Sequence, residues 1–214
     1  VGKWGELTPS RQRGGSGWCL SLTHYSNHHE LSAQERETLL GIAMDAIAHG
    51  LAHKKAPSMD PTAFPTPLRE KRATFVTLEQ EGGLRGCIGS LRTTHSLVED
   101  LARNAFDAAF HDPRFSPLTR EELEGVTIKI SLLTPAEPMR FASEADLLDQ
   151  LRPGVDGLIL TTGSRCATFL PSVWASLPKP AEFLHHLKLK AGLAPDAWPP
   201  DVAVSRYTTE QISQ

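Results

Sequence analysis

The stretch Leu84-Arg85-Gly86-Cys87-Ile88-Gly89-Ser90-Leu91 decides how this sequence is interpreted. It combines small and apolar residues with one thiol and one guanidinium group. If the stretch is a strand, successive side chains point to opposite faces. One face then carries Arg85 and Cys87, and the other carries Leu84 and Gly86. Because a nearby cation can lower the pKa of a thiol, the pattern predicts a site without identifying its chemistry.

The residues before this stretch predict that it is the second strand of a β-hairpin. A β-rich run, Ala73–Glu79, comes first, and Gln80-Glu81-Gly82-Gly83 separates it from the stretch. Two glycines between two extended runs are typical of a hairpin turn. Glycine inside a strand often marks a bulge, or the close approach of a ligand or another backbone.

Length and composition set broad limits. The chain has 214 residues, of which 40% are hydrophobic, enough for the core of one domain or two small lobes. The formal net charge is −3, which disfavours a protein dedicated to nucleic-acid binding, because such proteins are normally basic. The sequence lacks an apolar run of the roughly 18 residues that a membrane span needs. We therefore expect no membrane partner and regard nucleic acid as a poor candidate.

Cysteine usage and the first residues indicate a cytoplasmic protein. The sequence has an odd number of cysteines, Cys19, Cys87 and Cys166, and none of them forms a CxxC pair. It therefore predicts neither a disulfide framework nor a zinc ribbon. Reduced thiols are the usual state of such cysteines in the cytoplasm. The first residues also show no apolar core of the signal-peptide type.

Residues 1–30 differ from the rest, and we interpret them as a flexible N-terminal tail. Gly14-Gly15-Ser16-Gly17 is a typical flexible segment. His24, His28 and His29 could suggest a metal site. No thiol or carboxylate follows them at a matching spacing, so a solvated polar tail is favoured and no metal site is predicted.

Beyond the tail, helices and strands follow one another without regular alternation. Ser32 with Glu35, and Ser96 with Glu99, have the spacing of capping boxes at helix N-termini. Hydrophobic periodicity predicts helices at 32–49, 97–110, 120–124, 143–151 and 181–191, strands at 73–79, 84–91, 126–132 and 202–207, and a hairpin at 158–170. Prolines make 57–67 irregular. This mixture predicts an α+β fold in which helices pack on a largely antiparallel sheet.

The Gly-rich stretch also resembles the signature of the AMMECR domain family, whose prokaryotic members are called AmmeMemoRadiSam system protein A. The resemblance covers about 31–214 and includes the segments Ala73–Leu78, His111–Phe115, Val126–Leu133, Phe169–Pro171 and Lys190–Leu193. It implies one AMMECR-like domain at 31–214 with a smaller second lobe beside the larger one, and it places the motif near a cleft between them.

The resemblance also implies partners. The family name refers to a gene system that encodes a Memo-like protein and a radical SAM protein, so these two are the implied partners. Radical chemistry would then belong to the partner, because this sequence lacks the CxxxCxxC arrangement of iron–sulfur ligands. Val155-Asp156-Gly157 stands where relatives often have a histidine–glycine pair. If that histidine acts as a base in relatives, this chain lacks it.

Cys87 is the candidate catalytic residue. It could be a nucleophile or a redox-sensitive thiol activated by Arg85 and by nearby backbone amides. The alternative is a small apolar residue in a tight strand, because cysteine is often buried. A nucleophile also needs a base. His95 and His111 are nearest in sequence, and His185 and His186 could approach through the fold.

Further candidates surround the thiol in the sequence. Glycine amides at Gly86 and Gly89, flanked by Arg85 and Arg92, could bind an anion, or Arg85 could instead pair with a carboxylate and brace the hairpin.

The segment Asp112-Pro113-Arg114-Phe115 allows two interpretations. Asp112 and Arg114 could face a ligand, although a helix stop fixed by an Asp112–Arg114 ion pair is favoured.

The leading hypothesis is a cytoplasmic enzyme, or the accessory subunit of one. Its cleft, lined by Arg85, Cys87, Asp112 and Arg114, would bind a small anionic or peptide-like ligand. The sequence indicates no particular cofactor. The first alternative is a non-catalytic interaction module in which the Gly-rich motif is structural. The second is an RNA-binding protein, which the net charge disfavours.

Overall fold

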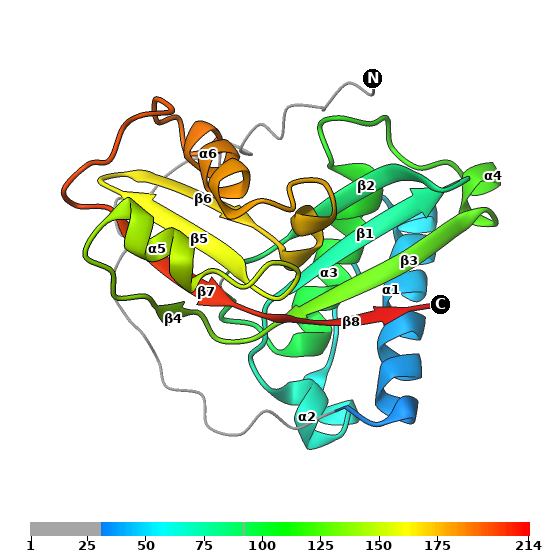
Figure 1. Cartoon of the computed structure of the whole chain (residues 1–214). Helices are drawn as coiled ribbons and strands as arrows, with labels where there is room; N and C mark the ends of the chain where they lie inside the picture. Colours follow the sequence, from blue (N-terminus) through cyan, green and yellow to red (C-terminus); the bar gives the residue numbers. More distant parts are fainter. Residues whose placement is uncertain (1–30, 92) are drawn as a thin grey trace. The chain divides into compact units, whose positions relative to one another are not determined.

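The computed structural model describes residues 31–91 and 93–214 (Figure 1). The predicted tail at 1–30, its histidines, Cys19 and Arg92 therefore lie outside the described residues. The described chain forms two compact units, one containing 31–134 with Glu210–Gln214 and the other containing Pro135–Thr209. Each unit combines helices with a sheet of antiparallel pairs, so the predicted α+β class is confirmed.

The unit that contains 31–134 is built on a four-stranded sheet. Its strand order is β2-β1-β3-β8, with bounds Gly83–Gly89, Thr74–Gln80, Val126–Leu133 and Thr209–Ser213 respectively. β1 pairs antiparallel with β2 on one side and with β3 on the other. Alternate residues such as Val76, Leu78 and Ile128 are fully buried and belong to the core of this unit.

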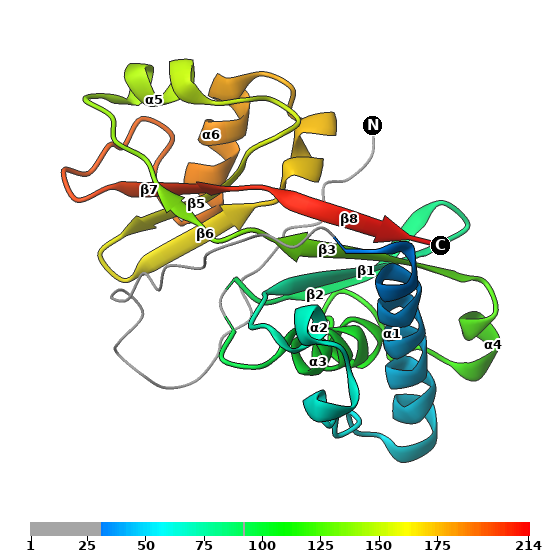
Figure 2. The same cartoon turned by 90° about the horizontal axis from the view of Figure 1, so that it is seen from below.

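Helices α1 (Ala33–His53) and α3 (Leu97–Phe110) cover one face of this sheet (Figures 1 and 2). Both begin with the predicted capping boxes. The predicted end of α1 near Gly50 is wrong. Gly50 lies inside the helix, where a Cβ atom would overlap the rings of Phe106 and Phe110. The helix ends at His53, and its C-cap is Lys54, which has φ 57°. Gly50 thus permits close helix packing and does not terminate the helix.

The proline-rich segment is more regular than predicted. It contains a 3₁₀ turn at Pro61–Ala63 and the one-turn helix α2 at Thr66–Arg69. Pro61 and Pro67 lie in the first turns of these elements. At that position proline costs little, because the missing N–H would have no helical partner. A second short helix, α4 (Arg120–Leu123), lies within the predicted helix at 120–124 and has Thr119 as its N-cap.

The unit formed by Pro135–Thr209 has its own sheet and core. The strand order is β4-β7-β5-β6, with bounds Glu137–Pro138, Ala203–Tyr207, Gly157–Thr162 and Arg165–Phe169 respectively. The same unit contains the helices α5 (Glu144–Gln150) and α6 (Pro180–Lys190) and a 3₁₀ turn at Pro171–Ala175. The stacked rings of Trp174 and Phe183 lie in the core. The predicted hairpin is confirmed, and the strand predicted at 202–207 is present as β7, although it is followed by β8 and is not the last strand. Helix α6 covers most of its predicted range.

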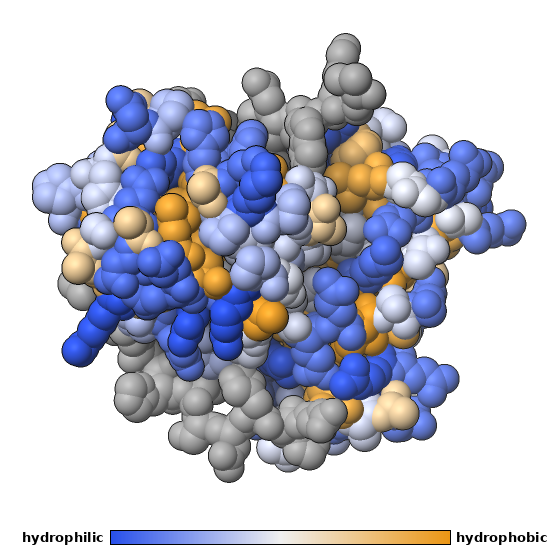
Figure 3. All heavy atoms as spheres, in the orientation of Figure 1, coloured by the Kyte–Doolittle hydropathy of each residue, from blue (hydrophilic) through white to orange (hydrophobic). Residues whose placement is uncertain are grey.

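No helix in the described part of the chain is both long enough and apolar enough to cross a bilayer. On the face shown in Figure 3, hydrophobic residues form separate groups between hydrophilic ones. Scattered apolar residues of this kind are normal on protein surfaces.

Candidate functional site

The hairpin that carries Cys87 contains a β-bulge at Arg85. Its turn residues, Glu81 and Gly82, have φ of 51° and 75°, as the central residues of a type I′ turn do. Glu79 stands opposite Leu84, but the next residue of β1, Leu78, stands opposite Gly86. Arg85 is therefore an extra residue on β2, and the register of the remaining pairs shifts by one.

The bulge overturns the predicted alternation of faces. Cys87 stands opposite Thr77, and Leu84 stands opposite Glu79, so Leu84 and Cys87 share one face. Gly86 stands opposite the buried Leu78 and lies on the helix-covered face. The prediction that Leu84 shares a face with Gly86 is therefore wrong, because one inserted residue reverses the alternation beyond it.

Both glycines of the motif permit close packing. A Cβ atom at Gly86 would overlap the backbone carbonyl oxygen of Ala108 on α3, and one at Gly89 would overlap the ring of Phe75. The close approach expected at these glycines is thus made by α3 and by a neighbouring side chain. Their proposed part in binding a ligand stays a prediction.

Arg85 braces the bulge through a carboxylate. Its Nε lies 2.9 Å from Oε1 of Glu122, and its Nη2 lies 3.0 Å from Oε2 and 3.0 Å from the Ser116 carbonyl oxygen. The Cζ atoms of Arg85 and Arg114 lie 5.8 and 5.4 Å from the centroid of the Phe115 ring. Of the two interpretations of Arg85, bracing by a carboxylate is therefore the one that these contacts match.

Asp112 and Arg114 hold the outer edge of β2 at Cys87. The Cys87 N–H donates to Oδ2 of Asp112 at 2.8 Å, and Nη2 of Arg114 donates to the Cys87 carbonyl at 3.4 Å. Arg114 Nε and Nη2 also donate to Asp112, at 2.9 and 2.6 Å. Because β2 is an edge strand, these side chains replace the neighbouring strand that Cys87 lacks. We call this arrangement the Asp112–Arg114 clamp.

The clamp is charged and largely buried, since only 4% of Asp112 is exposed. Burial alone would raise the pKa of the Asp112 carboxyl. The hydrogen bonds from the Arg114 side chain and from the Cys87 and Arg114 amides outweigh it, so the pKa is lowered. The hydrogen bond to Asp112 raises the pKa of Arg114 against the opposing effect of burial, and attraction to Asp112 and to Cys87 adds to it. The cation that acts on Cys87 is thus Arg114, whereas Arg85 is paired with Glu122.

The half-buried Cys87 thiol faces Thr77, whose Oγ1 donates to Sγ at 3.3 Å. Sequence reasoning missed Thr77, although a threonine in the strand before the motif was a possible signal. The contacts of the candidate bases are with other residues. His111 Nδ1 lies 2.7 Å from Oδ1 of Asp107, and His185 and His186 lie on α6 in the other unit. The structure therefore brings Cys87, Asp112 and Arg114 together, with Thr77 as a further member.

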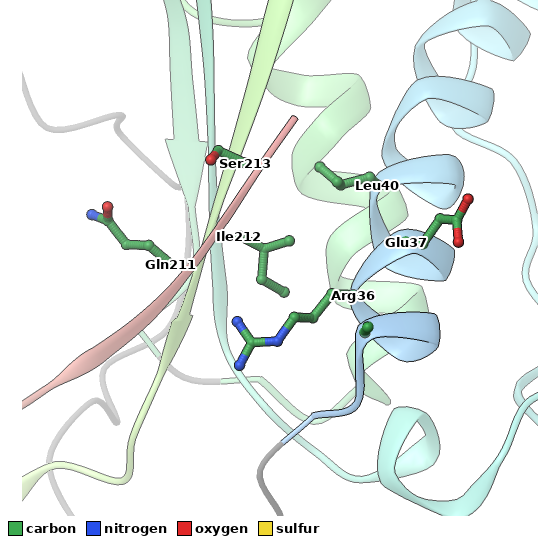
Figure 4. Close-up of a pocket in the computed structure, with 7 residues that line it drawn as sticks. Arg36, Glu37, Leu40, Gln211, Ile212 and Ser213 are labelled. Carbon is green, nitrogen blue, oxygen red and sulfur yellow. The ribbon is translucent and has the colours of Figure 1, made fainter.

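A shallow pocket of about 410 Å³ lies in the same unit, away from the predicted site residues (Figure 4). Ile212 points from β8 toward α1, and Gln211 points away from it. The pocket is lined by Ala33, Arg36, Glu37, Leu40, Gln211, Ile212 and Ser213. In the described parts of the chain, no three histidine, cysteine or acidic side chains form a group that could hold a metal ion.

The sequence profile of one protein family, AMMECR1, matches residues 40–212, which include most of both units and the whole of the Cys87 hairpin. The chain belongs to the AMMECR1 family. The resemblance inferred from the Gly-rich motif is thereby confirmed.

Relatives of this AMMECR1-family protein occur among archaea. A protein of Methanothermobacter thermautotrophicus is 40% identical over 182 residues, which cover 84% of this chain and 94% of the relative. Protein MJ0810 of Methanocaldococcus jannaschii is 36% identical, covering 78% and 84%. The crystal structure of the uncharacterized protein PH0010 from Pyrococcus horikoshii has 33% identity and a TM-score of 0.77, covering 85% of this chain and 92% of that one.

The Arg85–Glu122 pair predicts how stability depends on pH. The hydrogen bond from Arg85 lowers the pKa of Glu122 from 4.5 to about 2. A carboxyl whose pKa is lower in the folded protein stabilises it above the unfolded pKa and loses that contribution as the pH falls through the folded pKa. Because 28% of the Glu122 side chain is exposed, we expect Glu122→Gln to cost about 1–2 kcal/mol at neutral pH and almost nothing near pH 2.

Urea unfolding of the two proteins along a pH series, followed by circular dichroism, measures this difference. The control is Glu37→Gln, which changes an exposed carboxylate on α1. The difference between wild type and Glu122→Gln should shrink between pH 4.5 and about 2. A difference that stays constant across that window contradicts the prediction.

Proposed function

We propose that this AMMECR1-family protein is a cytoplasmic enzyme, or the accessory subunit of one, and that the Cys87 thiol is its reactive group. The observation that carries the proposal is that hydrogen bonds fix both the side chain and the backbone of Cys87. Its sulfur accepts a hydrogen bond from Thr77, while its backbone N–H and C=O are bound by the Asp112–Arg114 clamp. A reactive group is most effective when its neighbours fix its position in advance.

The charges near the thiol support this function. The Arg114 guanidinium attracts the thiolate form of Cys87, and the thiolate is the nucleophilic form of cysteine. Cys87 is half-buried, so a small reagent can reach it without unfolding the strand. Arg85, Gly86 and Gly89 then serve the site indirectly, because they shape and brace the strand that presents the thiol.

Arg114 also indicates the class of ligand. Among the described residues its Nε and Nη2 are bonded to Asp112 and to the Cys87 carbonyl, which leaves Nη1 available to an anionic group. The Arg114 side chain is 19% exposed, so a ligand can reach this side chain from solvent. We propose a small anionic or peptide-like ligand, and a Memo-like protein and a radical SAM protein as the partners.

A non-catalytic interaction module is the second candidate. The observation in its favour is that most of the motif has a packing or bracing task, since Gly86 fits against Ala108 and Arg85 pairs with Glu122. In that case Cys87 would be a strand residue of the right size and nothing more. RNA binding is disfavoured by the net charge of −3, because binding to nucleic-acid phosphates needs positive charge.

Residue-resolved alkylation separates these functions. The native protein is treated with iodoacetamide over a pH series, and mass spectrometry follows Cys87 and the exposed Cys166 separately. We expect Cys87 to react roughly tenfold faster than Cys166 at neutral pH, despite its lower exposure, because nearby donors and cations stabilise the thiolate. Cys87→Ser should abolish this reaction and leave the urea midpoint close to that of wild type.

The interaction module predicts the reverse. Cys87 would then react more slowly than Cys166 in the native protein and would become reactive only in urea. Cys87→Ser would lower the urea midpoint, because a packing residue would have been changed. Either result would refute the proposed thiol function.

A further inference from the structure

The two hairpins of this protein each place a threonine directly opposite a cysteine. Thr77 stands opposite Cys87 in β1–β2, and Thr161 stands opposite Cys166 in β5–β6. The hydroxyl groups are used differently. Thr77 donates to the sulfur of Cys87 at 3.3 Å, whereas Thr161 donates to the Ala203 carbonyl oxygen at 3.4 Å. The pairing of residue types therefore does not by itself create the hydrogen bond to sulfur.

The bulge at Arg85 is what brings Thr77 and Cys87 together. Without the extra residue, the register that begins at Glu79 and Leu84 would place Gly86 opposite Thr77 and Cys87 opposite Val76. Val76 is fully buried beneath the helices, so the thiol would then belong to the core face. The bulge moves it to the opposite face.

The backbone of Cys87 also favours a short distance between these side chains. Its N–H points outward to Asp112 and so does not bond to β1. In an antiparallel pair, residues that do not exchange backbone hydrogen bonds have Cα atoms about 4.5 Å apart, against about 5.5 Å for pairs that do. The clamp thus sets the outward orientation of the backbone, and that orientation brings Sγ close to the hydroxyl group of Thr77.

We propose that Thr77 is a positioning residue for the Cys87 thiol: its hydroxyl group orients Sγ and favours the thiolate. This inference rests on the proposed function of Cys87. When the thiol ionises, its proton passes to water and Thr77 keeps its own proton, which it donates to the negative sulfur. A hydrogen bond to an ionised acceptor is about twice as strong as one between neutral groups, so Thr77 stabilises the thiolate more than the thiol.

The charged groups around Thr77 and Cys87 form two ion pairs. Arg114 and Asp112 reach Cys87 from the segment after α3. Lys129 stands opposite Thr77 on β3, and its Nζ lies 2.8 Å from Oε1 of Glu79. Each cation has its own carboxylate, so much of its field is cancelled locally. The Thr77 hydroxyl group is uncharged and donates a hydrogen bond directly to the sulfur. It therefore stabilises the thiolate in a way that the two ion pairs do not.

The test compares Thr77→Val with Thr77→Ser by the alkylation assay. Valine keeps the shape of threonine and removes the hydroxyl group, whereas serine restores that group. We expect Thr77→Val to lower the rate at Cys87 about tenfold at neutral pH and to move the midpoint of its rate–pH profile up by about one unit. Thr77→Ser should restore most of both.

The second hairpin supplies the matched control. Thr161→Val removes a threonine that also faces a cysteine but donates elsewhere, and it should leave the profile of Cys166 unchanged. In Thr77→Val, an unchanged urea midpoint and an unchanged Cys166 rate show that both units remain folded.

The outcomes separate the positioning role from the function of Cys87. If wild type and Thr77→Val give the same profile while Cys87 stays faster than Cys166, the role of Thr77 is overturned and the thiol function stands. A slow Thr77→Val that serine does not rescue overturns it too, because the loss is then one of packing. If wild-type Cys87 is slower than Cys166, the proposed function fails together with the inference.

Discussion

Replacing Asp112 with alanine is expected to lower the free energy of unfolding by about 3–5 kcal/mol, because it removes one member of a buried ion pair and leaves the other. Arg114 loses its carboxylate partner, and the outward N–H of Cys87 loses its acceptor. Urea unfolding followed by circular dichroism measures the loss. Fluorescence is less suitable, because Trp174 and Trp198, the tryptophans of the described chain, lie in the unit formed by Pro135–Thr209.

Two comparisons show whether the loss comes from the clamp. The double variant Asp112→Ala/Arg114→Met removes both charges, so it should lose less than Asp112→Ala alone. Asp146→Ala removes a partly exposed carboxylate that accepts the Ala142 N–H at 2.7 Å without an arginine, and should cost about 1 kcal/mol. If Asp112→Ala costs no more than Asp146→Ala, the clamp does not stabilise the edge of β2.

The second large effect is expected for Gly86→Ala, which should cost about 3 kcal/mol, near the upper end for overpacking. The new Cβ atom would overlap the backbone carbonyl oxygen of Ala108. A backbone atom cannot turn aside as a flexible side chain can, so β2 or α3 must shift. The same urea experiment measures the cost.

Gly83→Ala is the matched control for this variant. Gly83 lies on the same strand, and a Cβ atom there would meet only the Gln80 carbonyl oxygen at 3.5 Å, an ordinary contact. It should therefore change stability by less than about 1 kcal/mol. Equal losses at both positions would show that the cost belongs to the strand backbone and not to the packing of α3.

The sequence predicted the elements whose signals are local. The capping boxes that begin at Ser32 and Ser96 each span four residues at the start of a helix. In β3, apolar and polar residues alternate along the strand itself. The strand β8 was missed for the opposite reason. Of its residues only Ile212 is buried in the core, and its partner β3 is distant in sequence. Such a strand is specified by the sheet it joins.

The sequence predicted the residues of the candidate site better than it predicted their geometry. Cys87, Asp112 and Arg114 do come together, and the predicted Asp112–Arg114 ion pair is present. The glycines of the motif indicated either a bulge or a close approach. The register of Cys87 was still not predictable, because an extra residue in a strand leaves no periodic signal of its position. It depends on Glu122, which holds Arg85 from 37 positions away, and on the close fit of Gly86 against α3.

The order of the two units along the chain has a consequence for synthesis. The unit formed by Pro135–Thr209 lies, in sequence, between β3 and β8 of the other unit. A ribosome therefore completes Pro135–Thr209 before it releases the strand that finishes the first sheet. Until then one side of β3 lacks its partner, and the core lacks Ile212. The nascent chain thus carries an open sheet edge while a whole second unit is made, the kind of surface that invites mispairing and that chaperones shield.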